Sequence, residues 1–355
     1  MRGTRRRAGR IRAWAALCAL ALLAVTGCAV GEDRGVTTLV FADNFSPTHP
    51  IGAGGVQPFI EHLREHGPAV GLDVDYFGAG QLGKQKDVLT LLDTGAIDMG
   101  LVIPAYLADA LPLTGVGELP GLVTDSCAAG AAMMPMVSPG GLLYETELAN
   151  YGVLPLWPIS IPGYEIFTAT EKVSVPADVK GLMIRTPGGI GDRIVRGLGA
   201  APVSIPGPDL YEAIARATVS GAMLTRISVK SYSLEEIIGY STLGANLSAT
   251  SIYVSIDHEK WKTLTAAQQK VIRDASAMAQ GSVCKALTAA SDKAVEFMRS
   301  AGMHLHEITE AERPAWDAAL TPIRADWVRD LESAGLPAAA ALDEFEKRIG
   351  GASDE

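Results

Sequence analysis

The residue in this sequence best suited to bind a charged ligand is Arg185, which ends a short apolar run, Leu182, Met183 and Ile184. Pro187, Gly188 and Gly189 follow at once and favour a chain break. A strand buried on both faces has a continuous apolar sequence, and open α/β sheets bind ligands beyond the carboxyl ends of their strands. The planar guanidinium suits a carboxylate because two parallel charge-assisted hydrogen bonds form at once. The alternative is a structural arginine that pairs with a neighbouring acid.

Patterns for other chemistry are absent or incomplete. The run Gly189-Ile-Gly191 resembles a dinucleotide loop, but Ile194 stands at the third glycine position. The sequence has no Gly-rich phosphate loop with Lys-Ser/Thr and no Gly-x-Ser-x-Gly turn, and His304 and His306 have no further His or Cys near them in the sequence. We therefore expect no cofactor, no metal and no enzyme. The alternative from another class is a surface-anchored lipoprotein hydrolase, which would require a serine or cysteine nucleophile.

The elements that would position Arg185 alternate between strands and helices, which predicts an α/β fold with a mostly parallel sheet. The expected strands cover 37–41, 73–76, 98–102, 153–156, 164–169, 182–185, 222–225 and 252–255. The expected helices cover 55–66, 84–94, 125–136, 141–151, 191–198 and 209–218.

A capping box at Thr265 and Gln268 begins a helical pattern that continues to about Ser300. A helix of about 36 residues is roughly 54 Å long, which is longer than a single lobe of a two-lobed protein. Thr309 and Glu312 cap another helix over 314–331, and a last helix is expected over 337–349.

Several segments, in this order and spacing, resemble the DctP-type solute-binding proteins of TRAP transporters. They are Gly80-Gln-Leu-Gly83, Asp93-Thr-Gly-Ala-Ile-Asp-Met99, Gly-Leu-Met-Ile-Arg at 181–185, Gly-Ala-Ala-Pro-Val at 199–203, Asp-Leu-Tyr-Glu-Ala-Ile at 209–214, Tyr-Ser-Leu-Glu-Glu-Ile-Ile-Gly-Tyr at 232–240 and Trp261-Lys-Thr-Leu-Thr265. The resemblance covers nearly all of the chain after residue 36. It implies an extracytoplasmic receptor that delivers an organic acid to the membrane subunits of a TRAP transporter.

The resemblance also implies a two-lobed fold like that of periplasmic binding proteins, with the long helix bracing both lobes. We expect lobe 1 to comprise 37–160 with about 250–290, and lobe 2 to comprise 161–249 with about 291–350. Residues 1–27 are expected to be a lipoprotein signal peptide and residues 28–36 a tether.

The sequence departs from the family pattern at the ligand site. A second arginine, an asparagine and an aromatic residue are common in the family where this chain has Glu165, Leu224 and Gly207. One carboxylate anchor, Arg185, remains. The candidate ligand-binding residues are Arg185, Glu165, Tyr164, Phe167, Asn44, Gln85, Leu224 and Arg226, and Lys230 is a further candidate cation.

Glu165 has two interpretations. If it faces the pocket, it repels a second carboxylate, and the ligand is a monocarboxylate whose amine meets Glu165. If it points away, it neutralises Arg226 or Lys230. The first interpretation favours an amino or hydroxy monocarboxylate over succinate, malate or fumarate.

The N-terminus indicates export. Six arginines precede an apolar run over 13–25, which is too short to span a bilayer and has the length of a signal-peptide core. The run ends in Ala24-Val-Thr-Gly-Cys28, which resembles a lipobox with Cys28 as the lipidated residue; the alternative is an ordinary signal peptide with an incidental cysteine. We expect a periplasmic or cell-surface protein that is lipid-anchored to the outer face of the cytoplasmic membrane and contacts the membrane only through this anchor.

The charge balance excludes one class of partner. Removal of residues 1–27 takes away six arginines and no acids from a chain with 30 basic and 40 acidic residues, which leaves 24 basic residues and a net charge of −16. Such an acidic surface argues against nucleic acid as a partner. An anionic ligand remains compatible because a local cation decides its site.

The cysteines leave one pairing open. Cys18 lies in the expected signal peptide and Cys28 is the expected anchor, so Cys127 and Cys284 remain. Outside the cytoplasm two such residues can form a disulfide. The alternative is two buried free thiols in alanine-rich helices.

Overall fold

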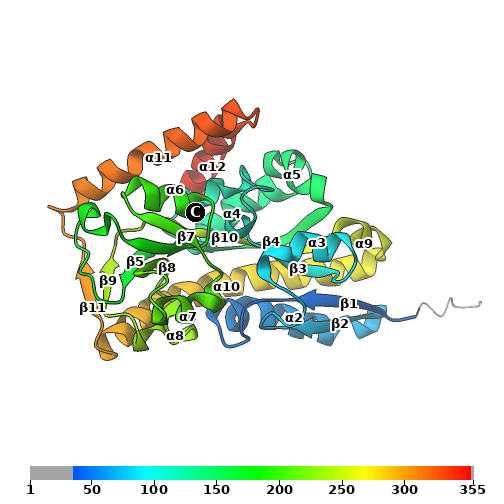
Figure 1. Ribbon diagram of the computed structural model, residues 1–355. Helices are drawn as coiled ribbons and strands as arrows, with labels where there is room; N and C mark the ends of the chain where they lie inside the picture. Colours follow the sequence, from blue (N-terminus) through cyan, green and yellow to red (C-terminus); the bar gives the residue numbers. More distant parts are fainter. Residues whose placement is uncertain (1–34, 353–355) are drawn as a thin grey trace, which may run out of the picture. The chain divides into compact units, whose positions relative to one another are not determined.

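The computed structural model describes residues 35–352, which form two β-sheets and the helices that cover them (Figure 1). The expected signal peptide, the lipidation site at Cys28 and the tether up to residue 34 lie outside these residues. Within the described part, no helix combines the length and the apolar character that a membrane span requires.

The first sheet has five strands in the order β2-β1-β3-β10-β4. They are β1 (Thr37–Ala42), β2 (Leu72–Phe77), β3 (Met99–Val102), β4 (Val153–Ile161) and β10 (Thr250–Asp257). β1 is parallel to β2 and β3, whereas β10 is antiparallel to β3 and β4. Every residue of β3 is buried, as expected for a central strand with both faces covered.

The second sheet has six strands in the order β11-β9-β5-β8-β6-β7. They are β5 (Tyr164–Thr168), β6 (Met183–Thr186), β7 (Ala201–Ser204), β8 (Gly221–Thr225), β9 (Tyr240–Leu243) and β11 (His304–Glu307). β6 is parallel to β7 and β8, and β9 is parallel to β11, but β5 is antiparallel to β8 and β9. The alternation pattern did not predict β7 or β9, which are short and partly polar.

Both sheets are therefore mixed, and the expectation of a mostly parallel sheet was too simple. The reason lies in how the chain crosses between the lobes. β4 ends at Ile161 and β5 begins at Tyr164, so the chain enters the second sheet directly from the first. β5 then begins at the edge where the parallel strands β6 and β8 end, and it must run opposite to them.

Shorter helices connect the strands. The α-helices before the long one are α2 (Gln57–His66), α3 (Val88–Asp93), α4 (Ser126–Val137), α5 (Leu142–Thr146), α6 (Ile190–Gly197), α7 (Leu210–Ala215), α8 (Ser228–Ser231) and α9 (His258–Thr263). One π-helical turn, η1 (Gly52–Val56), precedes α2. The 3₁₀ turns are η2 (Pro68–Val70), η3 (Gln85–Asp87), η4 (Pro104–Leu107), η5 (Thr114–Glu118), η6 (Leu148–Tyr151), η7 (Pro176–Val179), η8 (Gly207–Asp209) and η9 (Leu234–Glu236).

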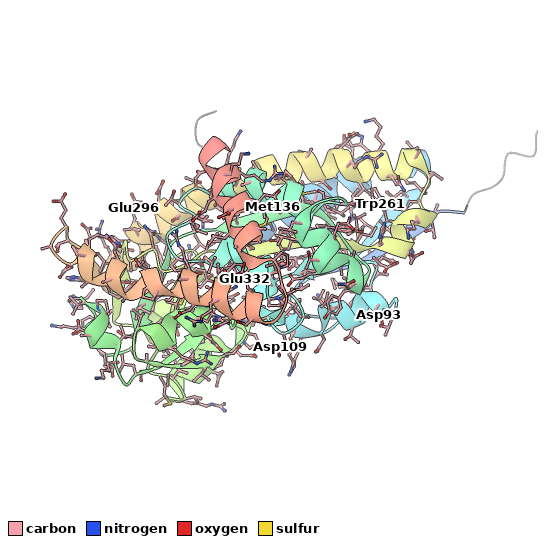
Figure 2. The ribbon with its side chains drawn as sticks, turned by 90° about the horizontal axis from the view of Figure 1, so that it is seen from above. Asp93, Asp109, Met136, Trp261, Glu296 and Glu332 are labelled. Atoms are coloured by element: carbon pink, nitrogen blue, oxygen red, sulfur yellow. A yellow bond between two sulfur atoms is a disulfide. The ribbon has the colours of Figure 1, made fainter. Side chains whose placement is uncertain are left out.

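The long helix is confirmed as α10 (Ala266–Ser300), with 35 residues and a length of about 52 Å. Its capping box forms as expected: Gln268 N donates to Thr265 Oγ1 at 3.2 Å, and Thr265 N donates to Gln268 Oε1 at 2.9 Å. α10 packs on α2, α4 and β4 of the first lobe and reaches α8 and β11 of the second. Figure 2 shows Trp261 near the start of this helix and Glu296 towards its other end.

The two last helices, α11 (Arg313–Ser333) and α12 (Ala338–Ala352), pack on different lobes. α11 lies against α6 of the second lobe, where Arg193 Nη1 and Asp330 Oδ2 are 2.6 Å apart. The chain reverses at Gly335, with φ of +85°, and α12 then packs on α4, burying Phe345. Residues 338–352 therefore join the first lobe, which differs from the expected assignment of 291–350 to the second.

Two extended segments cross between the sheets, and they are hydrogen-bonded to each other. Tyr164 N donates to Ser248 O at 3.2 Å, and Leu247 N donates to Tyr164 O at 3.0 Å. Ser248 Oγ donates to the backbone oxygen of Glu118 at 2.5 Å, which attaches the second segment to η5. These contacts hold the start of β5 and the start of β10 together at the boundary of the lobes.

Cys127 and Cys284 form a disulfide in the structure, which joins α4 to α10 across 157 residues of chain. Both helices pack on β4. The bridge thus ties the long helix to the first lobe and leaves its C-terminal half to reach the second.

We expect the double variant Cys127→Ala/Cys284→Ala to have a free energy of unfolding lower by about 2–4 kcal/mol, because a long closed loop restricts the unfolded chain. Urea denaturation of oxidised wild type and variant measures the difference. Wild type in excess reductant is the control and should approach the variant. Equal stability of the variant and oxidised wild type would contradict the prediction.

Candidate ligand-binding site

The loops at the carboxyl ends of β1, β3, β6 and β8 meet at the boundary of the two sheets, where they line a cavity of about 40 Å³ that we call the inner chamber. The starts of β5 and β10, which run antiparallel to these strands, contribute Tyr164 and Thr250. Open α/β sheets bind ligands at this edge, because the loops there are free to vary while the strands hold them in place.

Arg185 lies in the inner chamber with only 1% of its surface exposed. Its Nε donates to Ile205 O at 2.7 Å, Nη1 to Met223 O at 3.4 Å and Nη2 to the Tyr106 hydroxyl at 3.1 Å. One hydrogen on each terminal nitrogen remains without a partner among the described residues. The two backbone carbonyls fix the guanidinium, and one N–H on each terminal nitrogen can still donate to a ligand.

The charge of Arg185 is not neutralised by the protein. The ion pairs formed within residues 35–352 include other arginines but not this one. All three of its hydrogen-bond acceptors are neutral oxygens. A buried cation with only neutral partners favours binding of an anion, because the free-energy cost of removing the cation from water has already been met during folding.

Tyr106 brings the first lobe to this cation. Its hydroxyl oxygen accepts from Arg185 Nη2 and from Gly207 N, at 3.1 and 3.2 Å. With both acceptor positions used, the hydroxyl hydrogen is left to donate. Tyr106 follows β3 in the first lobe, whereas Arg185 and Gly207 belong to the second, so these two hydrogen bonds cross the boundary between the lobes.

Aromatic rings from both lobes form one wall of the chamber. The ring centroids of Phe45 and His49 are 4.7 Å apart, and those of His49 and Tyr232 are 6.0 Å apart. Gly207 makes room for the last ring, since a Cβ at this position would lie 2.8 Å from the Tyr232 hydroxyl oxygen. The ring of Tyr232, from a different segment, thus occupies the space beside Gly207.

An outer chamber of about 540 Å³ adjoins the inner one and shares Phe45, Ile103, Tyr106 and Tyr232 with it. Two sequence-predicted residues, Asn44 and Gln85, lie there. Asn44 Nδ2 donates to Gly83 O at 2.8 Å. Gln85 Nε2 donates to Leu101 O, while its buried Oε1 has no partner among the described residues.

Glu165 does not line either chamber, so its expected contact with the ligand does not form. Its carboxylate accepts from Thr242 Oγ1 at 2.7 Å, Gly244 N at 2.7 Å and Ala245 N at 3.0 Å, beside and after β9. Arg226 Nη2 lies 3.9 Å from Glu165 Oε1. The structure agrees with the second interpretation, in which Glu165 points away from the pocket and pairs with Arg226. Burial raises the pKa of Glu165, and these hydrogen bonds oppose the rise.

The other predicted residues divide between the chamber and the core. Tyr164 and Leu224 line the inner chamber, and the Tyr164 hydroxyl is hydrogen-bonded to Thr250 Oγ1. Burial raises the pKa of Tyr164, which keeps it a neutral phenol. Phe167 is fully buried in the core of the second lobe and Arg226 is held by Glu165, so neither reaches a ligand in this arrangement.

Sequence reasoning missed Phe45, His49, Tyr106 and Tyr232. One signal was available for the first three: they follow β1 and β3, and ligands bind beyond the carboxyl ends of such strands. Tyr232 stands in the family-like segment 232–240, but nothing local showed that its ring fills the space above Gly207.

The model of bacterial extracellular solute-binding proteins, family 7, matches residues 41–330. The chain belongs to this family. The C4-dicarboxylate-binding periplasmic protein DctP of Rhodobacter capsulatus is 25% identical over 311 residues, which cover 85% of this chain and 89% of that protein.

Solved structures share the fold of this family 7 protein. A TRAP solute-binding protein from Rhodoferax ferrireducens, in complex with copurified benzoate, has a TM-score of 0.81 at 20% identity, covering 90% of this chain and 99% of that chain. A TRAP periplasmic solute-binding protein from Bordetella bronchiseptica, with bound (R)- and (S)-mandelate, has a TM-score of 0.76 at 21% identity, covering 89% and 99%. These likenesses confirm the two-lobed fold.

Asp43 fixes the loop that contains Phe45 and His49, two residues of the site. It is 1% exposed and accepts from Phe45 N at 2.7 Å and from the Tyr76 hydroxyl at 3.1 Å. Burial raises the pKa of Asp43 from 3.8 to about 7, although these hydrogen bonds oppose the rise. The folded protein then holds a proton that the unfolded chain has lost, so this group contributes stability at low pH that is lost as the pH rises from about 4 to 7.

We expect Asp43→Asn to remove this pH dependence. Relative to the variant, wild type should lose up to about 4 kcal/mol in the free energy of unfolding between pH 4 and pH 7.5, since each pH unit corresponds to about 1.4 kcal/mol. Urea denaturation at several pH values measures the effect. Asp75→Asn, on the exposed side of β2, is the control and should follow wild type. Parallel curves for wild type and Asp43→Asn would contradict the prediction.

Proposed function

We propose that this protein is the receptor of a TRAP-type transporter, which captures a small organic monocarboxylate and delivers it to the membrane subunits. The observation that carries the proposal is the buried guanidinium of Arg185, which is fixed by backbone carbonyls and has no carboxylate partner in the described protein. A ligand carboxylate supplies the missing charge and accepts from both terminal nitrogens at once. Tyr106, whose hydroxyl hydrogen is left over, donates to the same carboxylate.

A single carboxylate fits this chamber better than two. Arg185 is its only permanently charged lining residue, and the other lining groups are aliphatic, aromatic or hydroxyl-bearing. A second carboxylate in the inner chamber would be buried without a cation, which is strongly unfavourable. The expectation of a monocarboxylate thus rests on the lack of a second cation among the described residues that line the inner chamber, since Lys84 lines only the outer one, and no longer on repulsion by Glu165.

Capture requires the lobes to move apart and close again. Arg185 and Tyr232 come from the second lobe, while Phe45, His49 and Tyr106 come from the first, so closure assembles the site around the ligand. The crossing segments at Tyr164 and Ser248 are the natural hinge, because they are joined to each other across the boundary. The membrane subunits would then recognise the closed receptor.

The alternative of a lipoprotein hydrolase gains no support from the described residues. The hydroxyls of Thr225 and Ser228 are 3.2 Å apart and bond to each other, and His49 Nδ1 accepts from Ile51 N. No serine in the inner chamber is hydrogen-bonded to a histidine, the arrangement that activates a nucleophile. No group of three or more His, Cys, Asp or Glu residues within 35–352 is arranged to hold a metal ion.

Arg185→Lys should weaken binding of the preferred monocarboxylate by roughly 30-fold or more, because lysine cannot form the bidentate pair. Arg185→Ala should weaken it further. Titration calorimetry on ligand-free protein gives the affinities, and thermal unfolding verifies the fold. Arg196→Lys, on the exposed face of α6, is the control and should bind as wild type. A folded Arg185→Ala protein with wild-type affinity would remove Arg185 from the site.

Cys28 is proposed as the lipid anchor, on the strength of the sequence Ala24-Val-Thr-Gly-Cys28 after the apolar run. We expect wild type expressed from its full gene to sediment with membranes and Cys28→Ser to be released into the soluble extracytoplasmic fraction, since a multiply acylated cysteine holds a protein firmly to a bilayer. Cell fractionation and mass spectrometry of the N-terminus measure this. Cys18→Ser is the control. Release of wild type and variant alike would favour an ordinary signal peptide.

A further inference from the structure

His49 is a polar group of the inner chamber that the proposed carboxylate site does not use. It is 2% exposed, and its Nε2 has no partner among the described residues. The ring stands between Phe45 and Tyr232 in the aromatic wall. An unpaired buried donor or acceptor is unfavourable, so a native protein that keeps one beside a binding site has a use for it.

The hydrogen bonding of His49 fixes its tautomer. Ile51 N donates to His49 Nδ1 at 3.2 Å, and a backbone N–H can only donate, so Nδ1 carries no hydrogen. The remaining ring hydrogen of a neutral imidazole is then on Nε2. Burial lowers the pKa of His49 to about 4, so the ring stays neutral at physiological pH. His49 therefore carries one neutral N–H, on Nε2, that no described group accepts.

Four other hydroxyl groups of the chamber wall already have partners. Thr225 and Ser228 bond to each other, and Thr250 bonds to the Tyr164 hydroxyl. A ligand body rich in hydroxyl groups would leave many of them unsatisfied against the apolar remainder of the wall, at a high cost. The inner chamber is narrow, with a volume of about 40 Å³, and a larger ligand body extends from it into the adjoining outer chamber of about 540 Å³. The chamber thus fits a compact, mainly apolar body with a single acceptor.

Three aromatic rings, those of Phe45, His49 and Tyr232, line this space. The Phe45–His49–Tyr232 wall offers ring faces and edges from both lobes, and aromatic pairs gain from stacked or edge-to-face contact beyond the area they bury. An aromatic body can pack on this wall while its carboxylate reaches Arg185, and closure of the lobes brings Tyr232 against it.

We propose that the ligand is an aromatic monocarboxylate that carries one hydrogen-bond acceptor on or beside its ring, and that His49 Nε2–H binds this acceptor. The proposal rests on the proposed function, since it assumes the carboxylate at Arg185. His49 is then the residue that selects among aromatic acids, while Arg185 selects for the acid group.

The test compares the affinities of benzoate, the three hydroxybenzoates, cyclohexanecarboxylate and succinate by titration calorimetry on ligand-free protein. We expect the best hydroxybenzoate to bind at least about 10-fold more tightly than benzoate, because a site that hydrogen-bonds a substrate group rejects the analogue that lacks it. Benzoate should in turn bind more tightly than cyclohexanecarboxylate, and succinate should bind most weakly.

His49→Phe keeps a ring in the wall and removes the donor. It should bring the affinities of benzoate and of the best hydroxybenzoate within about 3-fold of each other, mainly by weakening the hydroxybenzoate. His49→Gln keeps an N–H donor and should show part of the preference for hydroxybenzoate over benzoate. It is the variant to measure if His49→Phe does not fold. His62→Phe on α2, outside both chambers, is the matched control and should leave the preference unchanged.

A preference for hydroxybenzoate that survives in folded His49→Phe would overturn the role of His49. Tighter binding of cyclohexanecarboxylate or succinate than of any aromatic acid would overturn the aromatic class. If the binding of cyclohexanecarboxylate or succinate is then lost in Arg185→Lys, the proposed receptor function stands and only the proposal of an aromatic ligand fails. If none of these acids binds and no other carboxylate binds through Arg185, the proposed function itself fails.

Discussion

A buried cation without a protein counter-charge is the interaction on which the site depends. The guanidinium of Arg185 is held by Ile205 O, Met223 O and the Tyr106 hydroxyl, all of them neutral acceptors. Burial of a charge is tolerated only where hydrogen bonds satisfy it, and an opposite charge improves it further. The fold supplies the hydrogen bonds from the second sheet and one from the first lobe, and it leaves the opposite charge to the ligand. Selectivity for an acid and closure around it thus have the same physical origin.

The two mixed sheets explain how Arg185, a residue of the second lobe, comes to contact the first lobe. Parallel strands β1 and β3 end on one side of the boundary and β6 and β8 on the other, while the direct crossings before β5 and before β10 keep the two ends opposed. The crossings are hydrogen-bonded to each other at Tyr164 and Ser248, and α10 spans both lobes beside them (Figure 1). The disulfide fixes α10 to α4 of the first lobe. The disulfide therefore braces α10 against the first lobe.

Gly207 and Glu165, two of the positions where the sequence departs from the family pattern, have structural roles of their own. Gly207 has no side chain, and the Tyr232 ring occupies the space above it from another segment. Glu165 takes the position of a second cation, but its carboxylate is used by Thr242, Gly244 and Ala245, which fix the turn that leads into the second crossing. Arg226 is kept nearby as its partner. The result is a chamber with one cation, an aromatic wall and the neutral imidazole of His49.

The sequence by itself determined the features that depend on near neighbours in the chain. Apolar runs gave most strands, the Thr265–Gln268 capping box marked the start of α10, and the break after Arg185 placed this residue at a strand end. Tertiary structure decided the rest. The direction of Glu165 was set by donors nearly 80 residues away, the mixed sheets by the two crossings, and the place of α12 by burial of Phe345 against the first lobe. A side chain takes the rotamer that satisfies its polar atoms and fills space, and those partners here come from segments remote in sequence.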